Sequence, residues 1–197
     1  MTREGKERTR NVVTIGDNTA LIIIDVQEGL DDPRLGQRNN PMAERNMARL
    51  LERWRRLGRP IFHVQHMSTE PHSPLRPELP GNAIKSIVAP AGNEPVIQKR
   101  VNSAFIGTDL EQRLRQAGIE SLVIVGLTTD HCVSSSVRMA GDLGFKAVVI
   151  ADATAAHEHH SYDGQHYSAE TVHRLALANL YGEFATVLTS DQALGTD

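Results

Sequence analysis

The sequence predicts a single α/β domain of three layers (αβα), in which helices cover both faces of a six-stranded, mostly parallel β-sheet. Short apolar runs rich in Val and Ile alternate with longer segments of helical periodicity, which is the pattern of parallel sheets. Several runs are apolar at nearly every position, as strands buried on both faces are. A chain of 197 residues also fits one domain better than two. We therefore assign residues 1–197 to one domain, with an N-terminal extension over residues 1–18.

Six strands are predicted, each from an apolar run bounded by polar, Gly or Pro residues. The first run reads ALIIID and the fifth reads KAVVIA, so both lack the polar alternation of a strand with a solvent-facing side. The second, third, fourth and sixth runs read PIFHVQ, PVIQK, SLVIV and FATVL. In chain order the predicted strands are residues 20–25, 60–65, 95–99, 121–125, 146–151 and 184–188.

Four helices are predicted between these strands from apolar residues at intervals of three to four positions. The first begins at Pro41 and ends at Gly58, because Gly is typical just after a helix C-terminus. The last begins after Ser168, an N-cap residue, and extends to about Leu180.

The two middle helices carry their own start and stop signals. Thr108 and Glu111 have the spacing of a capping box, and Gly118 ends that helix. Asp130 is predicted as the N-cap of the next helix, which stops at Gly144.

Two segments lack a sustained period. Residues 67–94 are rich in Pro and His and are long for a connection within one domain, which favours a lid or a binding loop. Residues 157–166 read HEHHSYDGQH, which we interpret as a mobile polar loop before the last helix. A metal site and a lid over a pocket are the alternatives for this segment.

Composition argues against several classes of partner. The formal net charge of −3, with 21 basic and 24 acidic residues interspersed, gives no reason to expect nucleic acid or an anionic membrane. The first residues are charged and lack the apolar run of a signal peptide, and no run approaches the roughly 18 apolar residues that span a bilayer. The single cysteine, Cys132, fits a reducing compartment. These features predict a cytoplasmic protein.

Three residues with reactive side chains lie at the carboxyl ends of predicted strands. Asp25 ends the first strand, Lys99 ends the third, and Cys132 follows the fourth in the turn before a helix. Ligands of open parallel sheets bind at this edge, so we expect the carboxylate, the ammonium and the thiol to meet there. A structural role is the ordinary interpretation of each residue alone, but their joint placement favours a catalytic site.

Cys132 is the candidate nucleophile. With Asp130 as N-cap it falls in the first turn of a helix, where backbone N–H groups and the helix dipole favour a thiolate. A nearby lysine acts in the same direction, and a nearby carboxylate can take the proton. We therefore expect a lowered pKa for the Cys132 thiol.

Three segments of the chain occur in the order and spacing of one known family. They are IIIDVQ ending at Gln27, Lys99 with SAFIGTDL of residues 103–110, and VGLTTDHCV of residues 125–133. Through them the chain resembles the isochorismatase-like cysteine hydrolases, which include nicotinamidases, N-carbamoylsarcosine amidase, and biuret and ureidoacrylate hydrolases. The likeness extends from Thr19 to about Leu194 and implies a Rossmann-like sheet.

The resemblance implies an amidohydrolase that cleaves a C–N bond of a small amide, carbamoyl or ureido substrate. Asp25 is then the general base, Cys132 forms a thioester with the substrate, and Lys99 holds both in place. The family's oxyanion hole corresponds to the backbone amides of Thr128 and Cys132, beside a cis peptide between Leu127 and Thr128. No cofactor is implied.

Gln27 and Phe105 are the candidate substrate-binding residues of the family-like segments. Gln27 is expected to contact substrate or to orient Asp25. Phe105 is expected in the pocket wall, with core packing as the alternative. Because relatives form dimers or tetramers, the resemblance also implies a homodimer or homotetramer.

The sequence departs from the nicotinamidases in the segment after the second strand. Nicotinamidases bind a divalent metal there through an Asp-x-His and a further histidine. This chain has His63, His66 and His72 in that region but no aspartate, so no metal site is expected.

Two alternative functions stay open. Isochorismatases that cleave a vinyl ether lack the nucleophilic cysteine, so the presence of Cys132 makes that reaction the second hypothesis. A non-catalytic binding scaffold is the third, although a scaffold has no reason to keep Asp25, Lys99 and Cys132 together.

Overall fold

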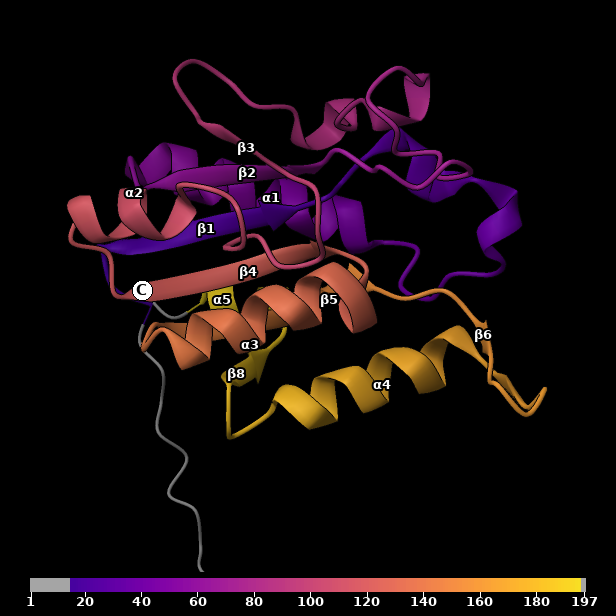
Figure 1. The fold of residues 1–197 in the computed structure, drawn as a ribbon. Coiled ribbons are helices and arrows are strands. Elements are labelled where there is room, and N and C mark those ends of the chain that lie inside the picture. Colours follow the sequence, from indigo (N-terminus) through magenta and orange to yellow (C-terminus); the bar gives the residue numbers. More distant parts are fainter. Residues whose placement is uncertain (1–14, 196–197) are drawn as a thin grey trace, which may run out of the picture.

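The central sheet is parallel throughout and confirms the predicted fold class (Figure 1). The computed structural model describes residues 15–195. The strands of the sheet are β1 (Thr19–Ile24), β2 (Ile61–His66), β3 (Val96–Lys99), β4 (Ser121–Leu127), β5 (Lys146–Ala155) and β8 (Ala185–Leu188). Their spatial order is β3-β2-β1-β4-β5-β8, and every adjacent pair is parallel.

Helices form the two outer layers. Helix α1 and the short α5 cover one face of the sheet, and α2, α3 and α4 cover the other. The helices are α1 (Ala43–Leu57), α2 (Leu110–Gln116), α3 (Ser134–Asp142), α4 (Ala169–Leu180) and α5 (Ser190–Leu194).

Strand β1 is buried on both sides, as its unbroken apolar run predicts. Ile22 and Ile24 pack in the core between the sheet and α2, α3 and α4. Leu21 and Ile23 point the opposite way and pack with Met47 of α1. This alternation follows from the two-residue period of a strand, and it fixes which face each isoleucine occupies.

The connections create a crevice at the carboxyl edge of the sheet. From β1 the chain continues to β2 and β3 on one side, and β4, on the other side of β1, begins the second half. The loops after β1 and β4 therefore leave the sheet in divergent directions, which is the switch point where ligands of such sheets bind.

Two predicted helix ends are confirmed. Gly58 caps α1 in the left-handed conformation, and the Ser168 side chain accepts a hydrogen bond from the Thr171 amide at the start of α4. The predicted capping box of α2 is wrong, because Asp109 is the N-cap and Thr108 Oγ1 accepts from the Leu110 amide at 3.4 Å rather than from that of Glu111. The Thr108 hydroxyl itself donates to the Ala104 carbonyl.

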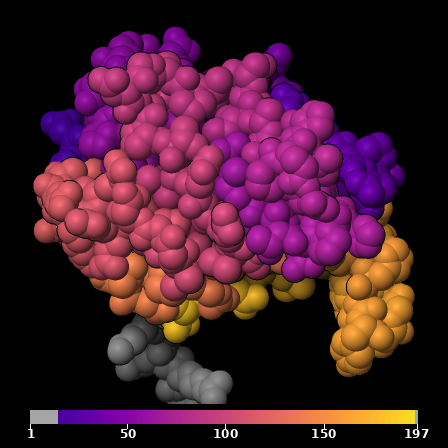
Figure 2. Space-filling view, turned by 45° about the horizontal axis from the view of Figure 1, so that its top comes forward, coloured from indigo at the N-terminus to yellow at the C-terminus, as the bar shows by residue number. Residues whose placement is uncertain are grey.

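The histidine-rich segment forms a small hairpin rather than an unstructured loop. Its strands are β6 (His159–His160) and β7 (His166–Tyr167), which are too short to leave a period in the sequence. Figure 2 shows this hairpin, in orange, projecting from the body of the molecule. Helix α5 was not predicted either.

The described residues bear on the predicted N-terminal extension and on the expectation of no membrane span. Residues 1–14 of the predicted N-terminal extension lie outside the described residues, whereas Ile15 is buried in the core beneath α1. Among residues 15–195 there is no helix with the length and hydropathy needed to cross a membrane.

Gly126 should be indispensable at the switch point. It pairs with Ile24 in the sheet and has φ of +129°, and a Cβ there would overlap the Ile24 backbone. We expect Gly126→Ala to lower the free energy of unfolding by more than about 2 kcal/mol. Urea denaturation measures this loss.

Gly144→Ala is the matched control for this variant. Gly144 also has a positive φ of +83°, but a Cβ there would meet no atom within 4 Å. Its substitution should cost only the conformational preference, about 1 kcal/mol. If the two variants lost equal free energy of unfolding, the close approach of β1 and β4 would not be the reason that Gly126 is required.

Candidate active site

Asp25, Lys99 and Cys132 converge at the carboxyl edge of the sheet. Asp25 directly follows β1, Lys99 is the last residue of β3, and Cys132 lies in the turn after β4. The Lys99 ammonium lies 2.5 Å from Asp25 Oδ2 and 3.3 Å from Cys132 Sγ. The side chains of Lys99 and Asp25 are 0% and 1% exposed. The three side chains therefore form one cluster, as the strand ends predict, with Asp25 and Lys99 buried and Cys132 half-buried.

The Asp25 backbone adopts an unusual conformation. Its φ is +52°, in the left-handed region that Asp tolerates better than most residues. Its amide donates to the Val64 carbonyl and its carbonyl accepts from the Gln27 amide, both at 2.9 Å. These bonds hold the sharp turn that follows β1 and place the carboxylate at the cluster.

His66 is a fourth member of the cluster. The Lys99 ammonium lies 2.8 Å from His66 Nδ1. An ammonium has three N–H donors and no acceptor, so the imidazole must accept at Nδ1 and carry its proton on Nε2. The Lys99 donors are thus all used, by Asp25, His66 and Cys132.

Burial and the Lys99 charge keep His66 neutral. Burial, and then the adjacent ammonium, lower the pKa of the His66 imidazole to about 4. His66 therefore stays an acceptor for Lys99 at neutral pH. It also lines the cavity described below.

The expected low thiol pKa is wrong. Burial, and next the Asp25 carboxylate, raise the pKa of Cys132 to about 12, although Lys99 acts in the opposite direction. Burial also raises the pKa of Asp25, against the Lys99 charge and the hydrogen bond from Lys99. Both acids resist losing their proton because charge is costly in this dry cluster. The Cys132 thiol is therefore neutral at rest.

The local helix geometry also differs from the expectation. Residues Thr129–Val133 form one π-helical turn capped by Thr128, and α3 begins only at Ser134. Asp130 is therefore not the N-cap, and Cys132 does not occupy the first turn of a regular α-helix. The helix-terminal position that was expected to lower the pKa of Cys132 is therefore not present, and burial has the largest effect on that pKa.

A cavity of about 660 Å³ opens onto Cys132. Asp25, His66, Asn102 and Thr128 also line it. This volume is in the range of small-molecule sites. The predicted cis peptide between Leu127 and Thr128 is present. Asn102 Oδ1 lies 3.7 Å from Cys132 Sγ, so its amide group stands next to the sulfur.

Gln27 does not line the cavity. It is 0% exposed, and its Oε1 accepts from the His66 amide at 2.8 Å. Its Nε2 donates to the carbonyls of Asn82 and His66. The side-chain amide is thus engaged by backbone, so Gln27 holds the end of β2, and with it His66, rather than contacting a ligand.

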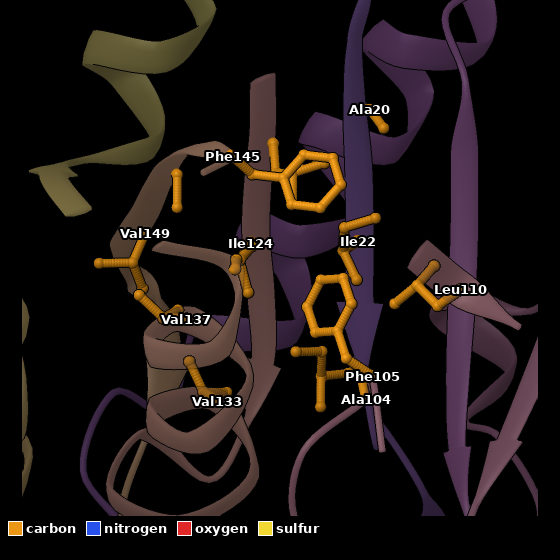
Figure 3. Packing of buried hydrophobic residues seen from close by; sticks show 14 of the residues in the cluster. Ala20, Ile22, Ala104, Phe105, Leu110, Ile124, Val133, Val137, Phe145 and Val149 are labelled. Carbon is orange, nitrogen blue, oxygen red and sulfur yellow. The ribbon is translucent and has the colours of Figure 1, made fainter. Parts of the chain in front are cut away.

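Phe105 lies in the core rather than in the cavity wall. Its ring stacks on Phe145 with 5.9 Å between centroids. Figure 3 shows it beside Ile22 and Ile124 of the two central strands. Of the two interpretations of Phe105, the structure favours core packing.

His63, His66 and His72 do not form a metal site like that of the nicotinamidases. His63 Nε2 lies 2.8 Å from Glu94, and His66 Nδ1 accepts from Lys99. His72 is exposed on the following loop. Their ring nitrogens face different partners, so these residues do not fit such a metal.

His66 and Asn102 are the residues that sequence reasoning missed. The alternation of IFHVQH places His66 at the end of β2, on the same edge as Asp25 and Lys99. The strand-end rule that found the others could have found it. No comparable signal marks Asn102, which lies in an irregular turn after β3.

Comparisons with known proteins identify the family of the chain. A family model described as the isochorismatase domain matches residues 19–192. The chain is 48% identical to YrdC of Bacillus subtilis, an uncharacterized isochorismatase family protein, over 90% of this chain and 95% of that protein. It is 32% identical to the ureidoacrylate amidohydrolase RutB of Methylobacterium radiotolerans, over 57% of this chain and 41% of that protein.

A solved structure shares the whole fold. It is a protein from Chromobacterium violaceum assigned to the isochorismatase family of hydrolases. The two structures superpose with a TM-score of 0.88 at 44% sequence identity, over 92% of this chain and 96% of that one.

Alkylation by iodoacetamide should report the raised thiol pKa. Because only the thiolate reacts, the rate for the wild-type protein should rise with pH and reach no plateau below about pH 10. The Asp25 charge raises the pKa of Cys132, so Asp25→Asn should lower that pKa and speed alkylation at pH 7.5 at least several-fold.

Asp163→Asn is the control, since it removes a carboxylate from the tip of the exposed hairpin. Its alkylation profile should match that of the wild type. A plateau near neutral pH, or slower alkylation of Asp25→Asn, would show that the thiol is not held protonated by burial and Asp25.

Proposed function

The chain belongs to the isochorismatase family, and we propose that it is a cysteine hydrolase that cleaves a C–N bond of a small amide, carbamoyl or ureido substrate through a thioester on Cys132. The observation that supports this most is the buried cluster on the cavity wall. There the Lys99 ammonium contacts a carboxylate, an imidazole nitrogen and the only cysteine sulfur of the chain.

The first step joins proton transfer to nucleophilic attack. Asp25 Oδ1 is buried and has no hydrogen-bond partner among the described residues. A carboxylate oxygen of Asp25 and the Cys132 sulfur lie within 4.8 Å of each other. As Sγ bonds to the substrate carbonyl carbon, Asp25 takes the thiol proton. The thiolate therefore need not exist before the substrate arrives, which fits the raised pKa of Cys132.

Charge balance makes this transfer possible inside a dry cluster. Before the proton transfer, the cluster holds the Asp25 carboxylate, the Lys99 ammonium and a neutral thiol. After it, Asp25 is a neutral carboxyl group beside Lys99, and the negative charge lies on the oxygen of the attacked carbonyl. The raised pKa of Asp25 makes its carboxylate a stronger base than an exposed aspartate. Lys99 stays charged throughout and balances whichever partner carries the negative charge.

The carbonyl oxygen becomes an oxyanion, and we assign its stabilisation to the backbone amides of Thr128 and Cys132. Both residues line the cavity, and the cis peptide before Thr128 sets the course of the backbone there. Fixed backbone donors at such an oxyanion usually supply the largest single contribution to catalysis.

Collapse of the intermediate breaks the C–N bond. The Asp25 carboxyl group donates its proton to the departing ammonia or amine, and the acyl group stays on Cys132. A water then gives its proton to Asp25 and attacks the thioester. The C–S bond breaks, the acid leaves, and the proton returns from Asp25 to the sulfur, which restores the resting cluster.

The family membership and the cavity size support a small C–N substrate. The family includes the ureidoacrylate amidohydrolase RutB, whose name describes hydrolysis of a ureido compound. The homo-oligomeric state and the cytoplasmic location that the sequence predicts stay predictions, since a single chain bears on neither.

Replacing the nucleophile should abolish turnover. We expect Cys132→Ser to lower kcat/KM at least about a hundredfold on any amide, carbamoyl or ureido compound that a screen for ammonia release identifies. After acid quenching, mass spectrometry of the wild-type protein should find the substrate's acyl group on Cys132. Ser135→Ala, at the start of α3 and outside the cavity lining, is the control and should keep full activity.

A Cys132→Ser protein with more than a tenth of wild-type kcat/KM would contradict the thioester route. Isochorismate belongs in the same screen. Its cleavage, with no amide accepted, would support vinyl-ether hydrolysis instead.

We further assign His66 the role of positioning Lys99. His66→Ala leaves one N–H of a buried ammonium without its acceptor, which costs about 1–3 kcal/mol. We expect kcat to fall roughly ten- to a hundredfold. His66→Asn supplies an amide oxygen in place of Nδ1 and should restore most of the rate. Equal activity of the two variants, whether low or high, would remove His66 from this role.

A further inference from the structure

A second cluster of ligand-type side chains lies on the rim of the cavity. Asp130 and His131 belong to the turn that carries Cys132, and His159 begins β6 of the projecting hairpin. His159 Nε2 lies 2.8 Å from Asp130 Oδ2, and His131 Nδ1 lies 3.3 Å from the same oxygen. The proposed hydrolysis uses none of these three side chains.

The distances within this cluster are close to those between ligands of a tetrahedral metal ion. Zn²⁺ binds His nitrogen and carboxylate oxygen at roughly 2.0–2.1 Å, so neighbouring ligand atoms in a tetrahedron lie about 3.3 Å apart. The three ligand atoms here all lie within 4.8 Å of one another, and two of the separations are 2.8 and 3.3 Å. Small side-chain rotations would bring them around one ion.

The state of Asp130 favours a cation at this position. Its side chain is 15% exposed, and its Oδ1 is buried and accepts no hydrogen bond from the described residues. An unpaired buried carboxylate oxygen is costly. The ion pairs found for Asp130 in the described part of the chain are with His131 and His159. His131 also lies 3.3 Å from the Thr128 hydroxyl, a contact that a metal at Nδ1 would replace.

The catalytic cluster is a poorer place for a metal. Asp25, His66 and Cys132 also have ligand atoms within 4.8 Å of one another. The Lys99 ammonium, however, lies among them at 2.5, 2.8 and 3.3 Å and already supplies the positive charge. A divalent ion would have to displace this buried ammonium. No such cation competes at the rim among the ion pairs of the described residues.

We propose that Asp130, His131 and His159 bind one divalent cation of the zinc class at the rim of the cavity. Two imidazoles and a carboxylate are ligands that suit Zn²⁺ and Co²⁺. Three protein ligands leave a fourth position for water or for an oxygen of a bound molecule. Because His131 and His159 line the cavity, that position borders the space where a substrate lies.

The ion would also link two segments that are distant in sequence. It would fasten the base of the hairpin to the turn that carries Cys132. The hairpin segment already contacts residues 37 and 38. The Glu158 amide donates to the Gln37 carbonyl, and His157 pairs with Arg38. The metal would add a second attachment on the catalytic side.

Titration of the metal-free protein with Co²⁺ and Zn²⁺ tests the site without any assay of hydrolysis. We expect one ion per chain in equilibrium dialysis and visible Co²⁺ bands of a tetrahedral or five-coordinate N/O site. Asp130→Asn and His159→Gln should each weaken binding at least about tenfold. His160→Gln, a cavity-lining neighbour outside the cluster, should bind as the wild type does.

Cys132→Ser separates the two clusters. A sulfur-to-cobalt charge-transfer band that disappears in Cys132→Ser would place the ion in the catalytic cluster and overturn the proposal. Absence of stoichiometric binding would overturn it as well, as would equal affinity of Asp130→Asn and the wild type. Unchanged binding by Cys132→Ser, together with weakened binding by the two rim variants, would establish the site whatever the substrate is.

Discussion

The buried Lys99 ammonium is the interaction on which the site depends. A charged group without exposed surface must find partners for its donors, and Lys99 finds them in Asp25, His66 and Cys132. Those partners come from the ends of β1 and β2 and from the turn after β4. The sheet brings them together because parallel strands end at one edge. The ammonium in turn lowers the pKa of each partner, with or against the effect of burial.

This arrangement explains why the nucleophile is not a preformed thiolate. Burial raises the pKa of both Asp25 and Cys132, while Lys99 offsets part of the effect for each. A proton that moves between these two acids leaves the charge of the cluster unchanged. The proposed reaction therefore needs no change in the net charge of the buried cluster.

The turn from Leu127 to Val133 links the core to the cavity. Leu127 and Val133 are buried on opposite faces of the sheet, so the turn between them is held from both sides. Cys132 and Thr128 line the cavity from this turn, and Asp130 lies beside the hairpin through His159. The catalytic centre and the proposed metal site thus share one segment. The first holds the Lys99 ammonium, and in the second one carboxylate oxygen of Asp130, Oδ1, is buried without a hydrogen-bond partner among the described residues.

The sequence by itself determined the sheet and the placement of Asp25, Lys99 and Cys132. Apolar runs mark strands wherever both faces are buried, and strand ends share an edge in any parallel sheet. Only the tertiary structure decided the partner role of His66 and the direction of the Cys132 pKa shift. It also removed Gln27 and Phe105 from the cavity. The pKa of a side chain and its contacts depend on distances to segments far apart in the chain. Local sequence patterns do not encode those distances.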